Sequence, residues 1–219
     1  MRKALVAAAV LVSLVTFSRG AAAAGLSLFS GRTLGSSSAV NVSAGIPDAS
    51  LVYLTPYAGN ADWGAFVRLG YLTPIGSHGD NVWTAFGGSY KQNLRNYGKY
   101  NMGLQIDFGP AMWLSPDFMA GFTLGPALLI GVPLKDVATL DFGIGVPFMI
   151  FFKDGVFVNV PIGFKMGCEF FVDQSLTLNA NFEIGPGIQT FSDTGKKGTK
   201  SATNTDVYAL FKVGITFGL

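Results

Sequence analysis

The chain ends in the stretch VYALFKVGITFGL, residues 207–219. Its odd positions are apolar without a break, from Val207 to Leu219, whereas its even positions include Lys212 and Gly214. An apolar residue at every second position predicts a β-strand with one apolar face. The fold must therefore give this strand an apolar environment on one side only.

Four residues of this strand resemble a known assembly signal. Lys212, Gly214, Phe217 and Leu219 follow the order polar, gap, Gly, two gaps, hydrophobic, gap, hydrophobic. This order is similar to the terminal signal of bacterial outer-membrane β-barrels, in which the barrel-assembly machinery reads the last strand and the usual final residue is Phe. The resemblance to small barrels of the OmpA, OmpX and OmpW kinds implies an outer-membrane protein. It also implies contact with outer-membrane lipid, lipopolysaccharide and the assembly machinery.

Residues 1–24 are typical of a secretory signal peptide. Arg2 and Lys3 precede an apolar run over 4–17, and small residues at 22–24 suit cleavage. The alternative is an uncleaved anchor, but a spanning helix needs about 20 apolar residues. Without Arg2, Lys3 and Arg19, 12 basic and 13 acidic residues remain, a net charge of −1. This balance does not indicate a nucleic-acid partner.

The rest of the chain is apolar but unsuited to helices. Hydrophobic residues make up 49% of the sequence and charged residues 13%. The best candidate for a spanning helix, 118–134, is interrupted by Gly121, Gly125, Pro126 and Pro133, which break helices. For an exported chain of this kind, a closed barrel is the main way into a membrane.

Ten alternating segments predict the strands of such a barrel. They lie at 39–46, 51–58, 63–72, 82–90, 100–114, 118–132, 137–152, 156–172, 176–191 and 207–219. We therefore predict an all-β fold, an antiparallel transmembrane β-barrel of about ten strands (range 8–12) over residues 39–219. A lead-in over 25–38 forms an extra strand or an arm that is either periplasmic or lumenal. Residues 192–206, rich in Gly, Ser, Thr and Lys, are predicted to form a mobile extracellular loop.

Turn residues assign the two ends of the barrel. The turns at 115–117 and 153–155 are predicted to be extracellular if the mature N-terminus is periplasmic. Those at 133–136 and 173–174 then lie at the periplasmic end. Pro at the second position of 115–117 and the pair Asp154-Gly155 are typical of tight turns.

The alternation also assigns the two faces of the wall. Even positions in the strands from 118 to 170 are apolar and are predicted to face lipid, as are Phe122, Leu140, Ile144, Val158 and Phe182. Odd positions are mostly Gly, Asn, Thr and single charges, which suit a narrow lumen. A soluble sandwich also alternates, but its polar face carries far more charge.

Seven isolated charges are predicted to converge on one layer of this lumen. They are Arg68, Asp107, Asp141, Lys165, Glu169, Glu183 and Lys212. Because an unpaired charge in a confined lumen is costly, we expect a network of ion pairs, with Glu183 and Lys212 as its first pair. The network is either a gate or simply the packed core of the barrel, and we favour the packed core.

Prolines inside the predicted strands form a second unusual feature. They are Pro110, Pro126, Pro147, Pro161 and Pro186. A proline in a central strand removes a ladder hydrogen bond. These prolines therefore mark either bulges that let a small barrel curve or a lateral opening through which a hydrophobic molecule passes.

Residues for catalysis or metal binding are scarce. His78 is the only histidine, in a Gly-rich loop beside Ser77 and Asp80, and Cys168 is the only cysteine. One Cys and one His cannot form a zinc site, and adjacency in a loop is not triad geometry. We therefore expect no metal, no cofactor and no enzymatic activity.

Three functions fit these observations. The first, which we favour, is a structural or interaction role in the outer membrane, with envelope proteins as partners. The second is a narrow channel or a carrier of small hydrophobic molecules, as in OmpW-like barrels. The third is a lipid-A-modifying enzyme that uses His78.

Overall fold

The computed structural model describes residues 26–71, 81–115, 117–193 and 200–219, and the signal peptide predicted over 1–24 lies outside them. Within these ranges all regular structure is β. The strands are β1 (Ala39–Ile46), β2 (Asp48–Ala58), β3 (Ala61–Gly70), β4 (Val82–Asn96), β5 (Asn101–Ser115), β6 (Met119–Leu134), β7 (Ala138–Gly145), β8 (Phe148–Phe152), β9 (Gly155–Pro161), β10 (Gly163–Phe171), β11 (Leu176–Asp193) and β12 (Lys200–Gly218). The described part of the chain contains no helix that could cross a membrane.

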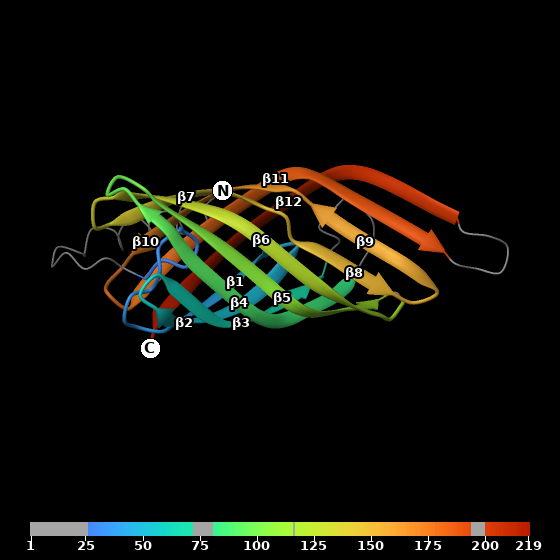
Figure 1. Cartoon of the computed structure of the whole chain (residues 1–219), viewed down its shortest axis with the longest axis horizontal. Coiled ribbons are helices and arrows are strands. Elements are labelled where there is room, and N and C mark those ends of the chain that lie inside the picture. The colour runs from blue at the N-terminus through green and yellow to red at the C-terminus, as the bar shows by residue number, and fades with distance from the viewer. Residues whose placement is uncertain (1–25, 72–80, 116, 194–199) are drawn as a thin grey trace, which may run out of the picture.

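The strands close into a single antiparallel barrel (Figure 1). Neighbours in the chain pair with one another, and β1 closes the ring by pairing with β12. β7 and β8 both pair with β6 and are two parts of one pass, interrupted at Val146 and Pro147. β9 and β10 likewise form one pass, interrupted at Ile162. The barrel therefore has ten passes, which confirms the predicted all-β fold and strand number.

The alternating passes give the barrel two ends. The terminal end contains the start of β1 and the end of β12, where Ala39 pairs with Gly218. The turns after β2, β4, β6 and β10 lie at this end. The distal end contains the connections after β5 and β8 and the long β11–β12 hairpin, which projects at the right of Figure 1. This confirms the prediction of which turns share an end of the barrel. The assignment of the two ends to the two sides of a membrane stays a prediction.

The prediction of a long loop over 192–206 is wrong in its described part. β11 continues to Asp193 and β12 begins at Lys200, and these two residues pair in an unbroken register. Thr190 faces Thr203, and Ile188 faces Thr205. β-branched residues such as these favour paired strands. The polar residues of this segment therefore form a two-stranded hairpin that is exposed to solvent on both faces.

Exposure separates the two faces of the wall as the alternation predicts. On the outer face, the side chains of Phe122 and Phe164 are 43% and 56% exposed. On the inner face, Asn159 and Glu169 are completely buried. The barrel therefore presents an apolar outer face, and its buried polar side chains point to the lumen.

Candidate functional site

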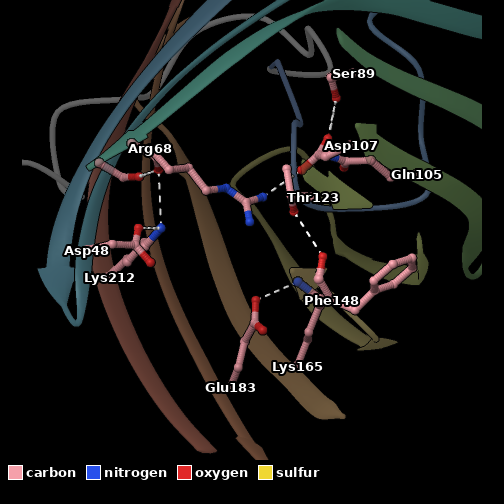
Figure 2. A network of polar contacts seen from close by, with 12 residues as sticks. Asp48, Arg68, Ser89, Gln105, Asp107, Thr123, Phe148, Lys165, Glu183 and Lys212 are labelled. Atoms are coloured by element: carbon pink, nitrogen blue, oxygen red, sulfur yellow. Dashed lines mark hydrogen bonds and ion pairs between the residues drawn. The ribbon is translucent and has the colours of Figure 1, made fainter. Parts of the chain in front are cut away.

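The middle of the lumen holds a layer of ion pairs, shown in Figure 2. Arg68 on β3 contacts Asp107 on β5, with 2.5 Å between Nη2 and Oδ2. Ser89 on β4 donates a hydrogen bond to the same carboxylate at 2.6 Å, and Gln105 donates another at 3.0 Å. These donors neutralise and orient the Asp107 carboxylate, so it is held as a structural acceptor.

Two further pairs complete this middle layer. Lys165 on β10 contacts Glu183 on β11 at 2.5 Å, and the Tyr208 hydroxyl donates to Glu183 at 3.0 Å. Lys212 on β12 pairs with Asp48, which opens β2. The middle layer thus balances three cations with three carboxylates.

The predicted pair between Glu183 and Lys212 is wrong. In the β11–β12 register, Glu183 lies opposite Leu210, and Lys212 lies opposite Asn181. Glu183 instead faces Lys165 directly across the β10–β11 ladder. Lys212 pairs with Gly45 on β1, and it reaches across this glycine to Asp48 on β2.

We expect strong coupling between Lys165 and Glu183. Lys165→Met and Glu183→Gln each leave one lumen charge without its partner, which costs about 3–5 kcal/mol for a deeply buried pair and less where water reaches it. The double variant should recover part of this loss. A double-mutant cycle by denaturant unfolding in detergent measures the coupling, and strictly additive losses would contradict it. The same cycle on Lys212 and Glu183 should give the smaller coupling.

The seven predicted lumen charges do not form one layer. Asp141 and Glu169 lie nearer the terminal end, together with Asp62 and Lys91, two buried groups outside the predicted set. Lys91 follows the predicted strand 82–90 by one residue, and Asp62 precedes the predicted strand 63–72 by one. Trp83 and Ser89 are on inward-facing positions of this strand, and Lys91 is the next inward-facing position after Ser89. Continuing the alternation by one step would therefore have identified Lys91.

The terminal end of the lumen is filled by the chain's own residues 26–34, which we name the lumen plug. Leu26 and Leu28 are buried and pack with Ala39 and Leu54. The plug's other contacts come from β3, β4, β6 and β10. Only the interior of the barrel reaches all of these strands. Of the predicted alternatives, the structure therefore shows a lumenal arm, and not an extra strand or a periplasmic arm.

Side chains of the wall bind the backbone of this plug. The Lys91 ammonium is completely buried and donates to the carbonyls of Ser27 and Leu28 at 3.0 and 3.3 Å. Glu169 accepts from the Ser27 hydroxyl and from the amides of Leu28 and Phe29. An unsatisfied backbone group is costly when buried, and these two side chains satisfy four backbone groups of the plug and one hydroxyl.

Two more wall residues extend this binding along the plug. Asp62 accepts from the Leu34 amide at 3.1 Å, and the Asn93 amide donates to the Gly31 carbonyl at 2.7 Å. At Gly31 the plug backbone lies so close to the β5 backbone that an added Cβ would clash with Met102 and Gly103. Glycine is therefore required at this position for the plug to fit.

On the distal side of the ion pairs, large apolar side chains fill the lumen. This aromatic layer consists of Phe66, Trp83, Trp113, Met149 and Phe151, with two buried alanines. The rings of Trp113 and Phe151 meet edge to face, with centroids 5.5 Å apart, an arrangement that adds to the stability of apolar burial. The lumen is thus packed on both sides of the middle layer.

An internal cavity of about 120 Å³ remains beside the ion pairs. Arg68, Asp107, Lys165 and Glu183 line it, and Phe29 of the plug also reaches it. The mixed lining suits several water molecules that bridge charged groups.

Prolines border this cavity where the wall's hydrogen bonding is interrupted. The β7–β8 pass pairs with the β9–β10 pass. Gly145 lies opposite Gly163, and Met149 lies opposite Asn159. In this register Pro147 faces Pro161, and both line the cavity. The amide of Val146 donates to the Pro126 carbonyl at 2.9 Å, and that of Ile162 donates to the Pro186 carbonyl at 2.8 Å. Four of the five predicted prolines therefore meet in one weakened area of the wall, while Pro110 lies separately on β5.

Comparisons with known proteins do not assign a family. No protein-family model and no curated protein matches this chain. The candidate catalytic residue His78 lies outside the described residues. In the part of the chain that the structure describes, no three His, Cys, Asp or Glu side chains gather as a metal site.

Proposed function

We propose that this chain is an outer-membrane β-barrel with a closed lumen and a structural or interaction role. The observation that carries the proposal is the filling of the lumen by the plug on one side of the ion pairs and by the aromatic layer on the other. A barrel that transports solutes through its centre needs a continuous polar passage, whereas this lumen is occupied by packed and hydrogen-bonded side chains.

The outer face supports the membrane setting. Phe164, Met166, Phe211 and Val213 are about half exposed and Ile184 is 42% exposed, on three consecutive passes. Continuous apolar surface of this kind is costly in water, whereas lipid matches it. Tyr97 and Tyr100, stacked beside the β4–β5 turn, suit the membrane interface, where aromatic residues with a polar group gather.

The assembly route and partners are part of the same proposal. Lys212, Gly214, Phe217 and Leu219 would be read by the barrel-assembly machinery, and lipopolysaccharide would surround the distal end. The β11–β12 hairpin offers exposed Ser201, Thr203, Asn204 and Thr205. Its length supports a contact with another envelope protein, which a pull-down from solubilised membranes would identify.

We expect no ion conductance from the wild-type protein in planar bilayers. Deleting residues 26–34 should also leave the lumen closed, because the aromatic layer remains. The same deletion combined with Trp113→Ala and Phe151→Ala should produce stepwise currents, since it removes the plug and two large side chains of the aromatic layer. This combined variant also shows that the assay can detect an opened barrel.

Heat-modifiable migration must first show that each variant is folded. Regular current steps from the folded wild-type protein would overturn the closed-lumen proposal and favour the channel hypothesis.

The proline area favours one second candidate, a carrier of small hydrophobic molecules. Because Pro147 and Pro161 line the cavity on a weakened part of the wall, a sideways path would not have to cross the plug or the aromatic layer. Saturable binding of an apolar fluorescent probe, abolished by a bulky side chain at Gly125 beside the cavity, would support this carrier. We do not propose catalysis, because the middle-layer carboxylates are held by cations.

A further inference from the structure

One edge of strand β12 has no neighbouring strand at the distal end. β11 pairs with β12 from Lys200 to Phe217, whereas β1 pairs with β12 only from Phe211 onward. No other described strand pairs with β12. We name the side of Ser201–Ala209 that points away from β11 the free edge. It belongs to the hairpin that projects from the barrel in Figure 1.

The backbone groups along the free edge have a fixed direction. In an antiparallel sheet the amide and carbonyl of one residue point to the same neighbour, and successive residues alternate. The amide of Gly218 donates to Ser175, just before β11, and that of Leu219 donates to Ser38, just before β1. Because the β11–β12 register is unbroken, the odd residues upstream also point away from β11. On the free edge these are Ser201, Thr203, Thr205, Val207 and Ala209.

The free edge is open to pairing over Ser201–Thr205. Native sheets protect an exposed edge with charges, prolines or bulges. This stretch has none of them, and all five of its side chains are exposed. Just beyond it, the amide of Val207 donates to the carboxylate of Asp206 at 2.7 Å, so that amide is already occupied. The stretch Ser201–Thr205 is therefore a template for another strand.

This stretch is complementary to itself in the antiparallel direction. A two-fold axis at Thr203 sets Thr203 opposite the partner's Thr203, and Ser201 opposite the partner's Thr205. All of these are odd residues, so each opposed pair exchanges both backbone hydrogen bonds. Thr–Thr and Thr–Ser pairs stabilise adjacent strands, as do opposite charges. The same register places Lys200 opposite the partner's Asp206, so opposite charges meet at its two ends.

We propose that two copies of this protein pair through the free edges of their β12 strands. The interface is isologous, because the same residues of both copies form it. Antiparallel pairing directs the two barrels distal end to distal end. In the membrane role proposed above, it would therefore join barrels of two facing membranes. The pairing itself needs only the free edge, so its failure would leave the closed-lumen proposal intact.

Analytical ultracentrifugation of LPS-free protein in detergent measures the pairing. The wild-type protein should form dimers whose fraction rises with concentration. Thr203→Pro removes an amide from the free edge without removing a hydrogen bond to β11, and proline is tolerated where the N–H faces away from the sheet. This variant should fold, as heat-modifiable migration shows, and stay monomeric. Thr203→Val keeps the amide and is the matched control, which should still form dimers.

Disulfide trapping in a Cys168→Ser background tests the register. The Cα atoms of two opposed, hydrogen-bonded residues lie about 5.5 Å apart, a separation that suits a disulfide. Thr203→Cys should therefore cross-link two copies under mild oxidation. Thr190→Cys is the control, because Thr190 faces Thr203 on β11 but lies between β9 and β12. It should not cross-link.

Two further variants place the two-fold axis. Ser201→Cys and Thr205→Cys should cross-link when they are mixed, and neither should cross-link alone. A wild-type protein that stays monomeric at every concentration would refute the proposal, as would equal cross-linking of Thr203→Cys and Thr190→Cys. Dimers that Thr203→Pro leaves unchanged would place the contact elsewhere and refute it as well. If Thr203→Pro fails to fold, the trapping experiments decide alone.

Discussion

Replacing Lys91 with Met should destabilise the barrel by about 3–5 kcal/mol, the usual cost of removing one partner from a buried charged cluster. Lys91 is completely buried, and its ammonium holds the carbonyls of Ser27 and Leu28. The substitution leaves these carbonyls without a donor, and it leaves Glu169 and Asp62 without their nearby cation. The plug should therefore lose its hold on the wall.

Denaturant unfolding of the folded protein in detergent measures this loss, with tryptophan fluorescence as the signal. Lys153→Met is the matched control, because Lys153 is exposed and pairs with Asp117 at 3.2 Å on the surface. Exposed pairs contribute about 0–1 kcal/mol. Limited proteolysis should cut the plug of Lys91→Met faster than that of the control. A loss no larger than the control's would show that Lys91 does not anchor the plug.

The overall barrel was predictable because its wall repeats one simple rule. Each pass alternates between lumen and exterior, and the C-terminal strand already shows this alternation over thirteen residues. A shift of one residue would move a whole strand's apolar set to the other face. Strand number and facing therefore follow from local patterns such as those around Phe122 and Asn159.

The partners inside the lumen were not predictable in the same way. Which charges meet depends on how far each strand is offset from its neighbour, and the sequence of one strand does not contain that offset. Glu183 and Lys212 have the right charges and lie on adjacent strands, yet their register places them opposite Leu210 and Asn181. Asp48 lies at a strand start, where alternation carries little information.

The position of the plug was left open among three alternatives for another reason. Residues 26–34 form a short segment without a regular period, inside a lead-in over 25–38 that is rich in Ser and Gly, so they resemble an ordinary linker. What places them inside the barrel is a set of side chains about 60 to 140 residues away, above all Lys91 and Glu169. Such long-range hydrogen bonds leave no local signal, although an isolated Lys on the inward parity of β4 was a clue to an unusual partner.

Replacing Ile144 with Lys should impair folding into liposomes by about 2–4 kcal/mol, the cost of a cation on the lipid face near the bilayer midplane. Ile144 lies near the middle of the pass formed by β7 and β8, on the outer face, and is 37% exposed. Leu140→Lys should cost less, because Leu140 lies two residues after the start of β7 and the penalty falls toward the interface.

The best control places the same cation on the inner face at a matching position. Gln105 faces the cavity. It pairs with Ala127 on β6, which pairs with Gly145 on β7, the residue after Ile144, so the two positions lie at a matching level of the wall. Gln105→Lys puts the ammonium near the Asp107 carboxylate and internal water, so its cost should be clearly smaller. Folding yields in liposomes, read by heat-modifiable migration, compare the three variants. If Ile144→Lys and Gln105→Lys fold equally well, the apolar face does not lie in lipid, and the barrel would need another apolar surface to cover it.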